Sequence, residues 1–483
     1  AVKPGTDGAL ACSIMHHLFK SNMADKAYLK KYTKDSDILE QHLTKHTPHW
    51  ASQICGISED EIISLANLIG ENKKTFLRLG YGFTRQRNGA NSMHAVASIA
   101  AITGSWLYEG GGALLANSGI YHWNKTLIEG LDAIDPDVRL LDQSRIGEIL
   151  TGVPATLSGG PPVKALFIQN TNPMSVAPNL NLVRSGFERE DLFTCVHEQF
   201  MTETAEMADI ILPATMFMEH DDFYQSGGHQ HIHFGPKLIT PPGECRSNHE
   251  VICDLAKRLN ASHEGFNLSA REIIDQTLVK SGWNNLETLE KEKWFDVQPD
   301  FETSHFINGF GHADKLWHFR ANWSEQQKVW GVEARKFQDT GLIKEMPALP
   351  DHWEVIEESN LSFPFRLVTA PARHFLNSSF TETATSQKRE KYPTLMINPL
   401  DAKSLGVEQD DWIVVSNKRG SLELRVKIFD GVNAGVVIAE SIWPNSAFKS
   451  GLGINVLTGS DPSGPVGGAA FHDNRVQIGP VKT

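Results

Sequence analysis

The sequence predicts a mixed α/β chain that ends in a β-barrel, and two features of its patterning carry this prediction. Apolar strand-like runs alternate with amphipathic helical stretches twice within the first 261 residues. From residue 365 onward, short apolar runs recur at regular spacing and are broken by Gly and Asp turns, which is typical of a compact barrel. We therefore expect two Rossmann-like units at residues 1–115 and 116–261, a mixed connecting region at 262–361 and a barrel at 362–483.

The composition is that of an ordinary globular protein and excludes several classes of function. The chain has 483 residues, enough for about three domains. A net charge of −13 argues against a nucleic-acid-binding surface, and no apolar run is long enough to predict a membrane span. None of the five cysteines forms a C-x-x-C pair, so the sequence predicts neither a zinc site of that type nor an iron–sulfur cluster within this chain.

The first unit is predicted from helix caps and one short strand. Apolar residues recur at helical spacing over residues 8–19, and Thr6 and Asp7 precede them as a cap. Ser58 and Glu61 form a capping box that starts a second helix. A strand at 75–79 leads into Gly80-Tyr81-Gly82, a helix follows at 90–102, and three glycines at 110–112 mark a boundary.

The second unit is predicted from three short apolar strands at 165–168, 192–196 and 210–212. Glu198 follows the middle strand, and in open parallel sheets ligands bind at the carboxyl ends of strands. Ser247 and Glu250 form another capping box, before a helix at 248–259. Residues 262–355 show weak periodicity and receive no assignment.

The barrel is predicted from five strands, at 366–369, 395–398, 412–416, 422–428 and 436–440.

Several side chains suit an anionic dinucleotide ligand. Glycines at 80 and 82 let backbone amides approach a pyrophosphate. Arg373 with His374 can pair with phosphate.

Five segments together resemble the molybdopterin oxidoreductases of the dimethyl sulfoxide reductase family, which includes formate dehydrogenase and nitrate reductase catalytic subunits. These segments are residues 4–10, 80–85, 170–173, 195–213 and 369–379. The resemblance implies a molybdenum- or tungsten-dependent enzyme that carries bis(molybdopterin guanine dinucleotide) and performs two-electron redox chemistry on a small substrate. It also implies that the barrel is of the double-psi type. By the same resemblance, the Asp7 carboxylate, which could otherwise only cap a helix, accepts two hydrogen bonds from the guanine of the cofactor.

The resemblance further implies a set of cofactor-binding positions, drawn from the beginning, the middle and the end of the chain. These are Gly5, Thr6, Asp7, Gly80, Tyr81, Gly82, Arg85, Asn170, Asn172, His197, Glu198, His220, Asn248, Thr369, Ala370, Arg373, His374, Phe375, Asn377, Ser378, Phe448, Asn455 and His472. Because a paired dinucleotide cofactor is long and needs contacts from several domains, we expect three groups of residues to line one continuous crevice: Asp7, Gly80 and Gly82; Asn172, Glu198 and His220; and Arg373, Asn377 and Asn455.

The chain departs from the family pattern where a substrate funnel is expected. Residues 222–226 replace a Gly-Thr-x-x-Asn pattern, which leaves the substrate open among formate, nitrate, sulfur oxyanions and organic oxides. Tyr224, Gln225, His229 and His231 are the funnel candidates. His229, His231 and His233 alternate on one strand face. No fourth ligand is visible beside them, so a polar strand or a funnel is favoured over a metal site, and we expect no metal ligand in this chain.

The chain begins without Met or a signal peptide, and we expect it to continue a longer protein. The expected preceding segment carries a [4Fe–4S] cluster and the metal ligand, so no catalytic residue is assigned here. An electron-transfer partner protein is expected. A cytoplasmic location is favoured, and a periplasmic one stays open because a twin-arginine signal would lie in that segment.

Two alternatives differ in class. A non-catalytic relative, such as a respiratory-complex large subunit, would keep the fold without the cofactor. A dehydrogenase using NAD is disfavoured because no G-x-G-x-x-G motif joins a strand to a helix.

Overall fold

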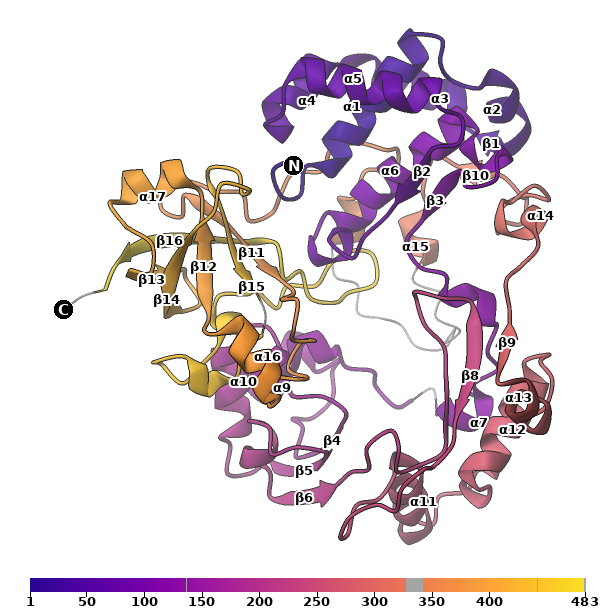
Figure 1. The fold of residues 1–483 in the computed structure, drawn as a ribbon, viewed down its shortest axis with the longest axis vertical. Helices are drawn as coiled ribbons and strands as arrows, with labels where there is room; N and C mark the ends of the chain where they lie inside the picture. The colour runs from indigo at the N-terminus through magenta and orange to yellow at the C-terminus, as the bar shows by residue number, and fades with distance from the viewer. Residues whose placement is uncertain (136, 327–341, 441, 482–483) are drawn as a thin grey trace.

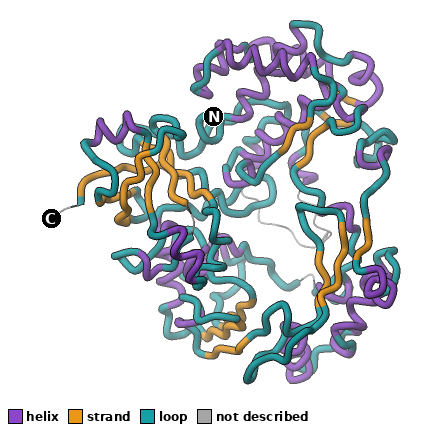
Figure 2. Tube along the Cα trace, in the orientation of Figure 1, coloured by secondary structure: helices purple, strands orange, loops and turns teal. Residues whose placement is uncertain are grey.

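The computed structural model describes residues 1–135, 137–326, 342–440 and 442–481. Figure 1 shows helices of the N-terminal region at the top, the barrel on the left, one small sheet below the barrel and another on the right. Loops connect much of the chain, as the tube in Figure 2 shows.

The N-terminal region packs helices around α1 (Asp7–Lys20). The helices α4, α5 and α6 pack against α1, and α1 and α6 bury small and apolar residues of one core. A short parallel pair of strands, β2 and β3, lies beside α6. The elements are α2 (Lys26–Tyr32), α3 (Ser36–His42), α4 (Pro48–Cys55), α5 (Glu59–Glu71), β2 (Phe76–Arg78), the 3-10 turn η2 (Phe83–Arg85), α6 (Gly89–Thr103) and β3 (Gly112–Leu114).

One predicted cap is wrong and another is confirmed. Thr6 precedes α1, but its hydroxyl donates to the carbonyl of Lys3 at 2.7 Å and caps no helix amide. Ser58 and Glu61 form the complete box at the start of α5. The difference arises because the chain before α1 turns back on itself, which satisfies Thr6 locally.

The middle region contains a three-stranded parallel sheet in the order β4-β5-β6, formed by Ala165–Gln169, Phe193–Glu198 and Ile210–Pro213. All three predicted strands are present within one or two residues. The helices near it are α8 (Ile146–Leu150), α9 (Pro173–Val176), α10 (Leu180–Phe187) and α11 (Asn248–Arg258). The capping box of Ser247 and Glu250 begins α11 as predicted.

A second small sheet, antiparallel, joins two parts of the chain. β7 (Asp222–Tyr224) and β8 (His231–Gly235) pair with each other, and β8 also pairs with β9 (Trp294–Asp296). The connecting region, left unassigned from sequence, therefore contributes a strand to this sheet. Its other elements are α12 (Ala270–Lys280), α13 (Leu286–Glu292), α14 (Phe301–Ser304), α15 (Trp323–Gln326) and β10 (Trp317–His318), which pairs with β1 (Thr33–Lys34).

The C-terminal region is a closed barrel with the strand order β11-β15-β12-β14-β13-β16. The five predicted strands are present, and a sixth closes the barrel. The strands are β11 (Phe365–Ala370), β12 (Thr394–Ile397), β13 (Trp412–Ser416), β14 (Ser421–Ile428), β15 (Val436–Glu440) and β16 (Asn474–Pro480), with α16 (Ala384–Glu390) and α17 (Pro399–Leu405) between them.

The barrel and the β4–β6 sheet share one hydrophobic core. Apolar side chains of β4, β5 and α10, such as Val183 and Val196, belong to the same buried cluster as Leu367 and Val426 of the barrel. The mixed α/β architecture with a barrel is therefore present, while the Rossmann-like description of each unit stays a prediction because the two parallel sheets have two and three strands.

Candidate cofactor site

The barrel has a cavity of about 270 Å³ at the end of β11, which we call the barrel cavity. It brings together residues from the two ends and the middle of the chain, including five of the predicted positions. Its lining comprises Arg85, Val176, Thr369, Ala370, Pro371, Ala372, Asn377, Ile442, Ile454, Asn455 and Phe471. The convergence of Arg85 with Thr369, Ala370, Asn377 and Asn455 agrees with the predicted grouping.

Arg85 brings a positive charge to this cavity, and His472, which follows the lining residue Phe471 in the chain, has a free ring nitrogen. Burial lowers the pKa of the half-buried Arg85, and the described residues provide no carboxylate in an ion pair with it. Burial, with a smaller effect from Arg85, lowers the pKa of His472 to about 4, so its imidazole is neutral at pH 7. His472 Nε2 is buried without a hydrogen-bond partner in the described structure. An anion with acceptor oxygens suits such a cation.

The N-terminal loop that carries Arg85 is bound firmly to the barrel. The His472 amide donates to the Arg85 carbonyl at 2.8 Å. Arg87 donates through Nε to Asp473 Oδ2 at 2.8 Å, and Arg366 of β11 donates to Asp473 Oδ1 at 3.1 Å. These buried, charge-assisted bonds hold Arg85 at the cavity.

The predicted guanine-binding segment lies next to the same loop. Asn88 Nδ2 donates to the Gly5 carbonyl at 2.7 Å, and a Cβ at Gly5 would lie 3.3 Å from Gln86 Oε1. Gly5 also has a φ of 84°, which favours glycine. Burial raises the pKa of Asp7, whose carboxylate has no side-chain partner among the described residues.

Gly80 and Gly82 stand in an open part of the loop. A Cβ at Gly82 would meet no atom within 4 Å, and one at Gly80 would meet only the Gly82 amide at 4.0 Å. Neither has a positive φ. Their backbone is thus open on the side where a side chain would stand, as the predicted close approach of a ligand requires.

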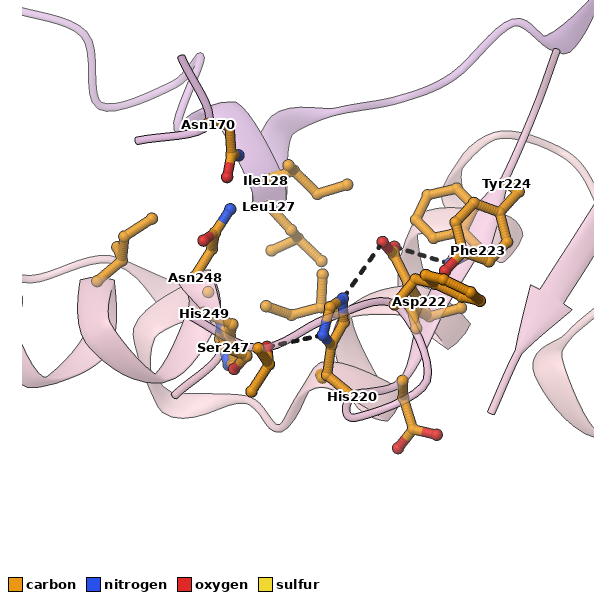
Figure 3. Close-up of a pocket in the computed structure, with 18 of the residues that line it drawn as sticks. Leu127, Ile128, Asn170, His220, Asp222, Phe223, Tyr224, Ser247, Asn248 and His249 are labelled. Atoms are coloured by element: carbon orange, nitrogen blue, oxygen red, sulfur yellow. Dashed lines mark hydrogen bonds and ion pairs between the residues drawn. The ribbon is translucent and has the colours of Figure 1, made fainter. Parts of the chain in front are cut away.

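A second cavity, of about 540 Å³, lies at the carboxyl end of the parallel sheet, and we call it the sheet cavity. Asn170, His220, Tyr224 and Asn248 line it, as do Gln199, which follows Glu198, and several apolar side chains. Figure 3 shows the side-chain amides of Asn170 and Asn248 facing one another across it. Position 170 has a φ of 57°, a turn conformation that Asn tolerates better than most residues.

His220 is held in the sheet cavity by two neighbours. Its Nδ1 shares a hydrogen bond of 2.8 Å with the Thr215 hydroxyl, and its Nε2 lies 3.8 Å from Asp222 Oδ2 (Figure 3). Burial raises the pKa of Asp222. The arrangement presents an imidazole and a carboxylate to a polar ligand.

The prediction of one continuous crevice stays a prediction. The barrel and sheet cavities are lined by different residues. Asn170 lines the sheet cavity, whereas Val176, at the end of α9, lines the barrel cavity. Asn172 lies between them in the chain and donates to Glu203 Oε2 at 2.7 Å.

Some predicted positions are used inside the fold. His197 is fully buried, accepts a hydrogen bond from Gln169 Nε2 at Nδ1 and donates through Nε2 to the Arg246 carbonyl at 3.1 Å. Phe375 and Phe448 belong to the shared core. The amide of Asn455 donates to the Ser175 carbonyl at 2.9 Å, so this residue lines the cavity while it links two elements.

Other predicted positions lie outside both cavities. Arg373 and Tyr81 are exposed, and His374 and Ser378 are half-buried. The funnel candidates Gln225, His229 and His231 line neither cavity. Tyr224 is the funnel candidate that lines one.

Sequence patterns missed Gln86, Asn88, Arg366 and Asp473, which together with Arg87 join the N-terminal loop to the barrel and to Gly5. A cluster of three polar residues directly after Arg85 was the available signal, since it sits between a glycine turn and a helix. Their partners lie far along the chain, so periodicity cannot identify them.

A search of the described residues for a helix both long and apolar enough to cross a membrane found none.

Two family models match the chain in the regions that form the two cavities. The model described as molybdopterin oxidoreductase matches residues 1–258, and the molybdopterin dinucleotide binding domain matches residues 365–475. The first match alone covers more than half of the chain.

Curated relatives match over nearly the whole chain. "Probable oxidoreductase YoaE" of Bacillus subtilis is 36% identical over 478 residues, which are 99% of this chain and 67% of that protein. The F420-dependent formate dehydrogenase subunit alpha of Methanocaldococcus jannaschii is 26% identical, with 90% and 63% covered. Dimethyl sulfoxide reductase DmsA of Escherichia coli is 25% identical, with 99% and 64% covered. The chain thus spans about two thirds of the length of these relatives.

A solved structure shares the fold. Acetylene hydratase from Pelobacter acetylenicus superposes with a TM-score of 0.74 at 16% identity, over 99% of this chain and 71% of that one. Together with the family models, these relatives identify the chain as a member of the molybdopterin oxidoreductases of the dimethyl sulfoxide reductase family.

Proposed function

We propose that this chain forms most of an oxidoreductase that binds bis(molybdopterin guanine dinucleotide) with molybdenum or tungsten. The observation that carries the proposal is the barrel cavity, where Arg85 of the N-terminal region meets Val176 of the middle region and Asn377 of the C-terminal region. The half-buried guanidinium of Arg85 has no carboxylate partner among the described residues, and an anion bound beside it would offset its loss of solvation. Cofactor phosphates supply that anion.

The two cavities suit the two halves of a paired cofactor. The barrel cavity is flanked by Arg85 and the Asn377 loop, and the sheet cavity offers amide and imidazole groups from Asn170, Asn248 and His220. The turn from Asn170 to Val176 reaches both. We infer that each cavity receives one dinucleotide.

In this proposal, the residues of this chain bind the cofactor and orient it. When bound, the cofactor supplies two-electron redox chemistry, which protein side chains do not provide. Arg85 and the open loop around Gly80 would hold phosphate, and Asp7, with its carboxylate free of side-chain partners, would accept hydrogen bonds from guanine N–H groups. His472, neutral at pH 7, would accept or donate one hydrogen bond through Nε2.

The substrate is proposed as a small molecule, in keeping with the formate and dimethyl sulfoxide named for two relatives. We also propose that electrons pass through a [4Fe–4S] cluster outside this chain to a partner protein. These steps belong to the full-length enzyme.

Cofactor occupancy tests the proposed function. Arg85→Ala and Arg373→Ala should each lower molybdenum or tungsten and pterin content in the purified full-length protein. Loss of a hydrogen bond to a charged group costs about 1.5–3 kcal/mol, or about ten- to a hundredfold in affinity. Arg373 lies outside both cavities, but on an exposed loop between Ala372 and Asn377, which line the barrel cavity, and it makes no ion pair within the described residues.

Lys427→Ala is the matched control, because Lys427 lies on the barrel away from both cavities and pairs with Glu440 at 3.7 Å. Equal occupancy in all three variants would oppose the assigned phosphate contacts. A full-length wild-type protein without pterin or metal would instead favour the non-catalytic alternative.

A further inference from the structure

The β7–β8 hairpin carries three histidines that neither cavity uses. His229 lies in the turn before β8, and His231 and His233 lie at or within the strand. Their ring centroids are 5.7, 5.3 and 6.0 Å apart in the three pairs. One nitrogen of each ring lies within 4.8 Å of those of the other two. The rings therefore form a triangle and not a row along the strand.

Hydrogen bonds to the backbone hold the turn in this position. The Tyr121 hydroxyl and the Asn117 amide donate to the His229 carbonyl at 2.7 and 2.8 Å. The His231 amide donates to His229 Nδ1 at 3.1 Å. β8 is also paired on both sides, by β7 and β9. The triangle is thus set by the fold, since Tyr121 is itself fully buried.

The rings are free to accept a ligand. In the described part of the chain, no hydrogen bond engages a ring nitrogen of His231 or His233, and no carboxylate belongs to this group of possible ligands. Three imidazole nitrogens that lie within 4.8 Å of one another, with no carboxylate in the group, are a ligand set of the type that transition metals such as zinc bind.

We propose that His229, His231 and His233 bind one divalent transition-metal ion, with Zn²⁺ as its representative, through one nitrogen each. Zinc–nitrogen bonds of about 2.0–2.1 Å require the rings to approach by small rotations. An ion at His229 Nδ1 would replace the bond from the His231 amide. The three rings are half-buried, which leaves a fourth position open to water or another ligand.

This site is separate from the proposed cofactor function, because its residues line neither cavity. It does adjoin the sheet cavity. Tyr224, which lines that cavity, pairs with His233 in the register of the hairpin. An ion bound to His233 would therefore lie one strand away from a residue that lines the sheet cavity.

A second histidine group in the chain provides the control. His42 and His46 face Asp351, with Nε2-to-oxygen distances of 3.1 and 2.8 Å. At these distances the Asp351 carboxylate already pairs with both Nε2 atoms, with a hydrogen bond to that of His46, and an ion would have to displace these contacts. We therefore expect this group to bind no zinc.

The experiment titrates Zn²⁺ into chelator-treated full-length protein by calorimetry, and Cu²⁺ serves as a second probe by electron paramagnetic resonance. We expect one zinc equivalent, and nitrogen couplings from imidazole in the copper spectrum. His231→Gln and His233→Gln should each weaken zinc binding at least roughly tenfold, since loss of even an outer-sphere partner has an effect of that size. The double variant His42→Gln, His46→Gln should bind zinc as the wild type does.

Absence of zinc binding to the wild type would overturn the proposal. So would loss of binding in the His42, His46 double variant with retention in His231→Gln. If circular dichroism shows that a strand variant is unfolded, His229→Gln, in the turn outside β8, replaces it, and unchanged affinity in that variant would also overturn the proposal.

Discussion

Arg85 and His472 are polar side chains that the fold leaves without a full set of partners, although the chain is acidic overall. Both side chains are partly buried beside the barrel cavity, where Arg85 stays without a carboxylate partner and His472 keeps one nitrogen free. Nearby Arg87 and Arg366 are instead neutralised by Asp473. The chain thus distinguishes arginines that hold the fold together from the one that faces the cavity.

The pH dependence of stability tests the burial of His472. Its pKa falls from an ordinary 6.5 to about 4, through burial first and Arg85 second. The unfolded chain binds this proton as the pH falls through 6.5, whereas the folded chain binds it only near pH 4. The stability due to neutral His472 is therefore present above pH 6.5 and lost between 6.5 and 4, by about 3 kcal/mol.

We expect the stability of His472→Gln to fall less than that of the wild type as the pH is lowered from 6.5 to 4. The measurement is the urea midpoint of the cofactor-free protein across this pH window. His122→Gln, at an exposed histidine, is the control and should keep the wild-type slope. A His472 variant whose midpoint falls as steeply as that of the wild type would contradict the burial effect.

The sequence could identify residues of the site, but it could not show which hydrogen-bond partners surround them. Arg85, Thr369 and Asn377, which the family resemblance implies as cofactor-binding positions, all line the barrel cavity. His197 was also expected to bind the cofactor, yet both of its ring nitrogens are used inside the fold. The sequence cannot show that both ring nitrogens of His197 have hydrogen-bond partners inside the fold, because the partners Gln169 and Arg246 come from other segments.

At the scale of elements, the helix α11 links a local sequence signal to the sheet cavity. Ser247 accepts from the Glu250 amide, and the Glu250 carboxylate accepts from Ser247 in return. Ser247, Asn248 and His249 all line the cavity. The capping box therefore orders the turn that presents Asn248.

We predict that Ser247→Ala weakens the first turn of α11 by about 1 kcal/mol, the usual effect of losing such a cap. Hydrogen exchange of the amides at 249–251 should speed up about fivefold. Ser247→Asp should retain protection, because aspartate also caps. Equal protection in Ser247→Ala and the wild type would show that packing, and not the cap, orders this turn.

Elements with strong local signals could be predicted, and those stabilised by distant pairing could not. Capping boxes and alternating apolar residues locate α5, α11 and five barrel strands within a few residues. The strands β7 and β9 have three residues each and pair only through β8. Three residues are too few to show a period, so the connecting region gave no prediction.

At the scale of the whole molecule, Asp473 joins regions almost 390 residues apart in sequence. It pairs with Arg87 at 2.8 Å and with Arg366 at 3.1 Å, and its side chain is 2% exposed. Removal of one partner from a buried ion pair costs about 3–5 kcal/mol, because the remaining charges stay buried.

We predict that Asp473→Asn lowers the melting temperature and exposes the loop at 80–88 to proteolysis, detected by limited digestion and mass spectrometry. Asp430→Asn is the control, since Asp430 is exposed on the barrel. Equal digestion of the two variants would mean that packing alone fastens the N-terminal loop to the barrel.

The two cavities lie on either side of the turn from Asn170 to Val176, and the central claim is that they hold the two dinucleotides of one cofactor. The most direct measurement is the amount of GMP released by acid hydrolysis of the purified full-length protein, compared with its molybdenum or tungsten content. Two dinucleotides around one metal predict about two GMP per metal atom, and a marked fall in both quantities in Arg85→Ala. Metal without GMP, or neither in the wild type, would contradict the claim.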